Sequence, residues 1–276
     1  MMGAHHAGTG AAAWVALTAT SPVIATLKDV PLLGTVPLHL IPALSITPLG
    51  PAAVAIGAIV AAGAALLPDA DHPNATIAYS IPGVGKAVTG MVGAAAGGHR
   101  HGTHSGISAI IVFLLAYCFT AIPGIVTTDP MSPYVLICGL IAAAMLCFAT
   151  KVLKIVRTWG MAWLVGITSS AAITFFAPEQ WAWLPWAIAV GWVVHMAGDF
   201  LTVGGLPITW PKNIKPPKWV SSVPVLKNIW MKNGYWALPI LGLTGSWRET
   251  MLATPLTMYG LYGAGASAIL LLPFMK

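Results

Sequence analysis

Long apolar segments alternate with short polar ones along almost the whole chain. Most of them approach the ~20 apolar residues that a helix needs to cross the hydrocarbon core of a bilayer. The pattern therefore predicts an all-α fold, a polytopic transmembrane helix bundle of roughly 6–8 spans. The segments expected to span the membrane are residues 11–27, 48–67, 107–126, 132–150, 158–177, 181–203 and 250–272.

Two further apolar segments are too interrupted or too short for a regular span. Residues 31–47 contain Pro31, Pro37 and Pro42. Because each proline removes a helical hydrogen bond, we expect a loop at the membrane interface there. Residues 84–98 are rich in Gly and Ala, which favours a short or re-entrant helix that packs closely against the rest of the protein.

The composition indicates an integral membrane protein with a single domain, residues 1–276. Hydrophobic residues make up 57% of the chain and charged residues only 7%, whereas a soluble domain has about 25% charged residues. The net charge of +6 is the difference between 13 Lys and Arg and seven Asp and Glu, and the basic residues are dispersed between the apolar segments. This dispersal argues against a nucleic-acid surface and favours anchoring beside the membrane. Residues 212–232 are rich in lysine, and we expect them to form a cytoplasmic loop.

The first polar cluster lies at the end of the apolar segment 48–67. Residues 66–73 hold Asp69, Asp71 and His72 between two prolines. The chain has only seven Asp and Glu in total, so two carboxylates one residue apart at the end of a predicted span indicate a functional site. Asp and His are also ligands of divalent metals. A plain turn is the alternative, because Pro and Asp are common turn residues.

The second polar cluster, residues 98–105, directly precedes another predicted span. It contains His99, Arg100, His101 and His104. Ser105 or Thr103 can cap the helix that follows, and a helix N-terminus beside an arginine suits a phosphate group. Because His99 and His104 are five residues apart, they do not share a helix face, and a turn must bring them together. A polar loop at the membrane interface is the alternative.

The third polar cluster lies inside an apolar segment, residues 181–203. His195 and Asp199 are four residues apart and therefore project from one face of a helix. A metal-ligand pair is one interpretation, and a buried hydrogen-bonded His–Asp pair is the other. Near the N-terminus, His5 and His6 precede the first apolar segment, where His6 is either a ligand or part of a solvated terminus.

The order of the spans places all three clusters on one side of the membrane. If the first span begins near His6, the second returns with Asp69, and the last of the central spans returns with His195 and Asp199. The same order puts the lysines of residues 212–232 on that side. The positive-inside rule makes this side cytoplasmic.

These three motifs resemble those of a known family of bacterial membrane proteins. The segment from Leu66 to Pro73, the Gly-His-Arg and Thr-His-Ser motifs of residues 98–105, and the stretch from His195 to Pro211 match a bacterial family in order and spacing. The chain resembles the inner-membrane metal-dependent hydrolases, some of which are controlled by the SOS repressor. The resemblance covers roughly residues 1–211. Members of that family begin with a histidine before an apolar helix, a place that His6 fills. The chain departs from the pattern at His101-Gly102, where a Gly followed by an aromatic residue is usual.

We therefore expect a membrane-bound metal-dependent hydrolase in the bacterial inner (plasma) membrane, with its metal site on the cytoplasmic side. The expected substrate is an ester or phosphoester, and a lipid or lipid-linked substrate is favoured. One or two zinc, manganese or iron ions are the expected cofactor. Asp71, Arg100 and His104 are the expected catalytic residues, with Arg100 binding a phosphoryl oxygen. The candidate ligands are His6, Asp69, Asp71, His72, His99, His104, His195 and Asp199. A transporter or channel for a metal ion, proton or small anion, and a scaffold with a structural metal, are the alternatives.

Overall fold

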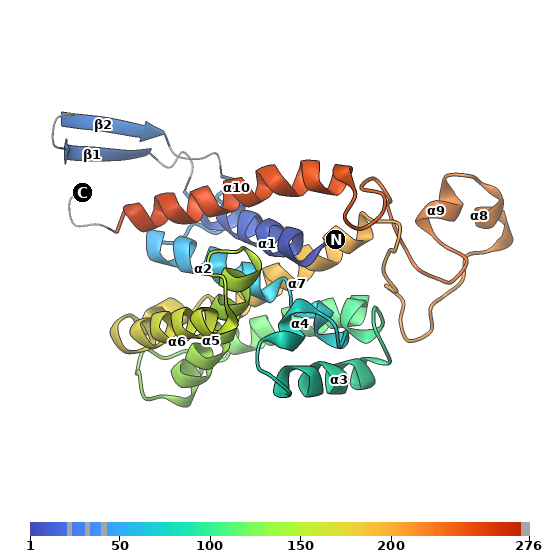
Figure 1. Ribbon diagram of the computed structural model, residues 1–276, viewed down its shortest axis with the longest axis horizontal. Coiled ribbons are helices and arrows are strands. Elements are labelled where there is room, and N and C mark those ends of the chain that lie inside the picture. Colours follow the sequence, from blue (N-terminus) through green and yellow to red (C-terminus); the bar gives the residue numbers. More distant parts are fainter. Residues whose placement is uncertain (21–23, 31–33, 40–42, 272–276) are drawn as a thin grey trace.

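The computed structural model describes residues 1–20, 24–30, 34–39 and 43–271. These residues are predominantly helical, as the apolar pattern predicts, and the longer helices run roughly parallel or antiparallel to one another (Figure 1). The longer helices are α1 (Gly3–Thr18), α2 (Pro51–Ala64), α3 (Val84–Ala96), α4 (Gly106–Ala121), α5 (Pro133–Val152), α6 (Trp159–Phe176), α7 (Leu184–Phe200) and α10 (Trp247–Ile269). Shorter elements are η1 (Pro68–Asp71), η2 (Thr76–Tyr79), η3 (Gly102–His104), η4 (Pro178–Trp181), α8 (Lys218–Ser222) and α9 (Leu226–Ile229).

The centre of the bundle consists of α1, α2, α7 and α10, which pack through small residues. A Cβ atom added at Gly10 of α1 would lie 2.7 Å from the carbonyl oxygen of Ala61 in α2, and one added at Gly191 of α7 would lie 2.5 Å from the same oxygen. At Gly260 of α10, an added Cβ would lie 2.6 Å from the amide nitrogen of Ala12. Small residues allow membrane helices to approach this closely. The packing holds α1, α2 and α7 in fixed positions relative to one another.

Three helical stretches among the described residues are long and apolar enough to cross a membrane. They are Pro51–Asp71, Pro133–Val152 and Trp159–Phe176, and they match three of the predicted spans. The helices α3 and α4 are apolar as well but shorter.

The expected first span, residues 11–27, is wrong in its bounds. The helix α1 already begins at Gly3 and ends at Thr18, and strand β1 (Ile24–Val30) follows. In the sequence, Pro22 stands where the helix would have to continue, and a proline lacks the required N–H. The earlier start has a consequence for function, because it makes His5 and His6 part of the helix.

The loop expected over residues 31–47 is replaced in part by a hairpin. Strand β1 pairs antiparallel with β2 (Gly34–His39), so that Ile24 lies opposite His39. A proline is tolerated here because both strands of a two-stranded sheet are edge strands. Residues 31–33 and 40–42 and the side chain of His39 lie outside the described part of the chain.

The short helix expected over residues 84–98 is present as α3, and it packs closely against η1 and η2. An added Cβ at Gly85 would lie 2.4 Å from the carbonyl oxygen of Ala78. One at Gly93 would lie 2.6 Å from the carbonyl oxygen of Asp71. The helix α3 therefore supports, from behind, the turn that carries the first pair of acidic residues.

The chain between α7 and α10 leaves the bundle. Residues 212–232 include α8 and α9, which lie on an extension at one end of the molecule (Figure 1). The apolar stretch 235–247 contains no helix before α10 begins at Trp247.

Candidate metal centre

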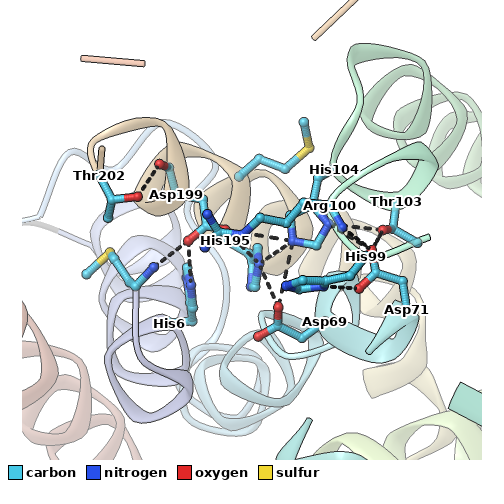
Figure 2. Close-up of polar contacts among 12 residues, drawn as sticks. His6, Asp69, Asp71, His99, Arg100, Thr103, His104, His195, Asp199 and Thr202 are labelled. Carbon is cyan, nitrogen blue, oxygen red and sulfur yellow. Dashed lines mark hydrogen bonds and ion pairs between the residues drawn. The ribbon is translucent and has the colours of Figure 1, made fainter. Parts of the chain in front are cut away.

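Four segments that are distant in the sequence bring the predicted polar residues together. Figure 2 shows His104 and His195 between two groups, one with His6 and Asp199 and the other with Asp71, His99 and Thr103. The helix α1 supplies His6, and η1, which follows α2, supplies Asp69 and Asp71. The segment between α3 and α4 supplies His99, Arg100 and His104, and the last turns of α7 supply His195 and Asp199.

Four donor atoms face one another at the centre of this group. The Nε2 atoms of His104 and His195 lie 3.1 Å apart, and each lies 3.7 Å from Oδ1 of Asp69. The Oδ2 atom of Asp199 lies 3.8 Å from the first nitrogen and 3.9 Å from the second. Ligand atoms about 2.1 Å from a tetrahedral ion lie about 3.4 Å from one another. These five separations are close to that edge length. Among the described residues, the sets whose atoms all lie close enough to share one ion are Asp69 with His104 and His195, and His6 with His195 and Asp199.

The other nitrogen of each imidazole determines which form the ring takes. Nδ1 of His195 lies 2.7 Å from the carbonyl oxygen of Ala65, which can only accept, so this nitrogen donates. Nδ1 of His104 lies 3.0 Å from Oγ1 of Thr103 and 3.2 Å from Oδ2 of Asp71. The Thr103 hydroxyl donates to Asp71, so Nδ1 of His104 donates too. Two neutral rings would then point lone pairs at each other across 3.1 Å.

Only a cation can stabilise two lone pairs that face each other in this way. A proton is one candidate. Burial lowers the pKa of His104, but the nearby carboxylates of Asp69 and Asp71 outweigh it and raise the pKa to about 9. A divalent ion is the other candidate, and it also accounts for the two further oxygens, because a shared proton needs only the two nitrogens.

Asp71 lies behind His104, and its oxygens face protein donors. Its Oδ1 atom accepts from Nδ1 of His99 at 2.8 Å, and its Oδ2 atom accepts from the Arg100 amide at 2.9 Å and from the Thr103 hydroxyl at 2.5 Å. A carboxylate that orients the far nitrogen of a metal-bound imidazole is a common arrangement in metalloproteins. The geometry thus separates the two acidic residues, with Asp69 facing the four-atom centre and Asp71 fixing the loop and His104.

His6 forms a second possible donor group with His195 and Asp199. Its ring is fully buried and stacks on that of His195, with the centroids 3.7 Å apart. Its Nε2 atom lies 3.3 Å from Oδ1 of Asp199, which also contacts the amino group of Met1. Among the described residues, neither ring nitrogen of His6 has a hydrogen-bond partner. A buried polar group without a partner is unfavourable, so a ligand role would remove this cost.

Arg100 reaches across the open side of the centre. Its Nη2 atom lies 2.9 Å from Oδ2 of Asp199, and 23% of its side chain is exposed. The backbone at Arg100 has a φ of 57°, and its carbonyl accepts from the Tyr235 hydroxyl at 3.2 Å. Gly204 makes room for the guanidinium, because an added Cβ there would lie 2.1 Å from Nη1. The accessible side of the site therefore presents Arg100 and Asp69, which is 28% exposed.

Comparison with known proteins places the chain in a family. A family model described as YdjM inner membrane protein matches residues 1–271. The chain belongs to the YdjM inner membrane protein family. No curated protein and no solved structure matches the chain. The YdjM match confirms the expected resemblance to bacterial inner-membrane proteins, and it continues beyond residue 211, where the motifs end.

Among the described residues of this YdjM family member, four histidines contribute none of the facing donor atoms: His5, His72, His99 and His101. Nδ1 of His72 accepts from the Asn74 amide at 3.1 Å, and its ring meets that of His99 edge-on. Nδ1 of His101 lies 3.0 Å from the carbonyl oxygen of His99. His5 points away from His6, with its Nδ1 atom 2.5 Å from Oε1 of Glu249. His72 therefore fits the alternative of a plain turn better than that of a metal ligand. His101 fits the alternative of a polar loop.

Sequence reasoning missed several residues that hold the site in place. Thr103 was expected only as a possible helix cap, whereas its hydroxyl donates to Asp71. Gly204 and Tyr235 act through contacts with Arg100, far away in the chain, and a single sequence contains no signal of such contacts. Glu249 does leave a signal. It stands three residues after Ser246, the spacing of a helix capping box, and the Ser246 hydroxyl accepts from the Glu249 amide at 3.3 Å. Its fully buried carboxylate then accepts from the Met2 and Gly245 amides, which ties α10 to the start of α1.

Proposed function

We propose that this protein is a membrane-bound metal-dependent hydrolase whose metal lies among His104, His195, Asp69 and Asp199. The observation that supports this most strongly is the contact between the two Nε2 atoms, 3.1 Å apart, whose rings each donate from the opposite nitrogen. One oxygen of Asp69 and one of Asp199 lie 3.7 to 3.9 Å from these nitrogens and would supply further ligands. Mixed nitrogen and oxygen donors suit zinc, manganese or iron.

A second ion beside His6 would share Asp199 with the first. Oδ1 of Asp199 faces His6, and Oδ2 faces His104 and His195, so one carboxylate offers an oxygen to each position. Pairs of metal ions about 3.5–4 Å apart are common in enzymes that cleave phosphoesters. Neither His6 nitrogen is committed to a hydrogen bond within the described structure, so the ring is available for this role.

A divalent ion at this centre would lower the pKa of bound water and polarise a phosphoryl oxygen. The residues of the chain contribute position and charge. Asp71 holds the His104 ring through Nδ1, and the Ala65 carbonyl holds His195 in the same way. Arg100, partly exposed beside Asp199, binds an anionic oxygen of the substrate. Transfer of water to an ester or phosphoester is the reaction that such an arrangement favours.

The site lies at the end of the span Pro51–Asp71, and this location favours a lipid or lipid-linked phosphoester. Headgroup phosphates are concentrated at the ends of membrane spans, whereas a soluble substrate would not require a site there. We propose that further helices, including α1, α4, α7 and α10, complete the expected 6–8 spans in one domain, residues 1–276. The YdjM family is one of inner membrane proteins, which agrees with this location.

The purified protein should contain a divalent metal and cleave radiolabelled phospholipids or p-nitrophenyl phosphoesters. A chelator should abolish turnover, and added zinc, manganese or iron should restore it. A protein that binds metal but cleaves none of these substrates, and that instead carries metal ions or anions into liposomes, would be a transporter.

We expect the metal site to face the cytoplasm. A reporter fused after Lys212 should show cytoplasmic activity, because the lysines of residues 212–232 are retained inside. A fusion after Asp129, in the segment between α4 and α5, provides the matched control and should be external. External activity of the Lys212 fusion would reverse the proposed orientation.

A further inference from the structure

Two apolar cavities lie one after the other along one side of α4. The first has a volume of about 370 Å³ and lies among α3, η3, α4 and Trp210. The second has a volume of about 260 Å³ and lies among α4, α5 and α7. Val112 and Trp192 line both of them, so the two cavities adjoin at these side chains, and together we call them the groove.

The groove follows a single face of α4. Residues four apart on a helix lie above one another, and one such row lines the groove: Ile107, Ile111, Leu115 and Phe119. From the first to the last of these the helix rises about 18 Å. This is slightly more than half of the ~30 Å hydrocarbon core, or about the depth of one leaflet.

The first cavity lies beside the loop that carries His104, and none of the candidate metal ligands lines it. Thr103, whose hydroxyl donates to Asp71, lines this cavity. Ser108 lines it as well, and its hydroxyl donates to the Thr103 carbonyl at 2.7 Å and accepts from Nε1 of Trp192 at 3.3 Å. These contacts fix the wall of the groove to the loop that holds His104.

The positions of lining residues on α7 show independently in which direction the groove runs. Trp192, at the junction of the cavities, lies three residues before His195. Leu184, at the far end of the second cavity, lies three helical turns before it. The groove therefore runs from the side of the loop that carries His104 toward the interior of the predicted membrane span.

We propose that this groove holds one acyl chain of a glycerophospholipid whose phosphate group lies at the metal centre. The inference rests on the proposed hydrolase function and specifies its substrate as a lipid with a long tail. The hydroxyls of Thr103 and Ser108 are engaged within the protein, so the lining offers an occupant almost only apolar surface. Leu115 and Phe119 are 52% and 45% exposed, which leaves the groove open sideways to lipid. A tail can therefore enter directly from the bilayer.

Photocrosslinking tests the proposal in proteoliposomes that contain the full-length protein. The probe is phosphatidylethanolamine with a diazirine near the end of one acyl chain, and the labelled residues are identified by peptide mass spectrometry. We expect labels at Leu115 and Phe119 of α4 and at Ile137 and Cys138 of α5, which line the second cavity. Excess unlabelled phospholipid should compete for these positions.

Two adjacent leucines provide a matched pair of variants. Leu115 lines the groove, whereas Leu114, which is 55% exposed, lies outside its lining. Leu115→Trp should fill the groove and reduce labelling at Ile137 and Cys138 about tenfold, and Leu114→Trp should leave it unchanged. Both proteins should retain their metal content, because neither leucine touches the centre. If a tryptophan variant fails to assemble, the distribution of labels in the unaltered protein still decides the question.

Labels spread evenly around α4, with no difference between the two variants, would identify ordinary surrounding lipid and overturn the proposal. Covalent links between copies at Leu115 would identify a second copy of the chain as the occupant and would overturn it too. Groove-specific labelling without any turnover would support the tail site while refuting the hydrolase. Turnover that is equally fast for short-chain and long-chain phospholipids, with even labelling, would support the hydrolase and refute the tail site.

Discussion

Replacing His195 with alanine should remove the metal from the purified protein and reduce metal-dependent turnover to background. His195 is the residue shared by both possible donor groups, and its ring is fully buried. Loss of a residue that only orients a ligand costs 10- to 100-fold in metal affinity, so loss of the ligand itself should cost more than about 100-fold. Metal content by mass spectrometry and turnover of a phosphoester substrate measure the two effects separately.

A histidine outside the donor set provides the control. His101 lies on the same loop as His104, but its Nδ1 atom contacts only the local His99 carbonyl among the contacts described. His101→Ala should therefore keep both metal and turnover. To separate loss of metal from loss of fold, His195→Gln retains most of the side-chain volume and should also lose the metal while remaining in the membrane fraction. Full metal content in both His195 variants would place the ion elsewhere.

The sequence could predict which segments contribute to the site, because each polar cluster interrupts an apolar pattern. The spacing of His195 and Asp199 placed both on one helix face, and they do face the same centre. The order of the spans placed the first and second clusters beside them. The reason is that consecutive apolar helices run in alternating directions, and the succession of apolar and polar segments is enough to predict this alternation.

The sequence could not separate neighbours within a cluster. His5 and His6 are adjacent, and only the start of α1 at Gly3 decides that His6 points toward α7 and His5 toward Glu249. Asp69 and Asp71 belong to a 3₁₀ turn whose exact direction depends on the contact with Gly93 of α3. Such choices are made by tertiary packing, for which a single sequence carries no signal.

The hairpin β1–β2 is a second feature that could not be predicted from the sequence. The prolines of residues 31–47 excluded a regular helix but did not determine what would replace it. Residues 24–30 hold Ile, Val and Thr, which favour a strand, yet the long apolar segment that begins at residue 11 made a helix the stronger prediction. The correct boundary depended on weighing Pro22 against the apolar pattern.

Replacing Arg100 with alanine should leave the metal bound and reduce turnover about 100- to 1,000-fold, the usual effect of removing one group that stabilises transition-state charge. The guanidinium is the cationic group on the accessible side of the described site, 2.9 Å from Asp199. Without the guanidinium, Oδ2 of Asp199 no longer has an ion-pair partner and is free to bind the metal. The metal affinity should therefore be unchanged or slightly higher. Arg100→Lys should recover only part of the rate, because lysine lacks the planar pair of donors.

Gly204→Ala offers a way to displace Arg100 without removing it. The new methyl group would meet Nη1 of Arg100, so the guanidinium must move and turnover should fall in the same direction as in Arg100→Ala, with the metal retained. Arg157→Ala, which removes an exposed charge far from the centre along the chain, should change neither quantity. If Arg100→Ala instead released the metal, Arg100 would serve mainly to hold Asp199 in place, and its proposed contact with a phosphoryl oxygen would be wrong. If turnover persisted in full with the metal bound, the substrate would approach the centre from another side, and the anionic substrate class would lose its main support.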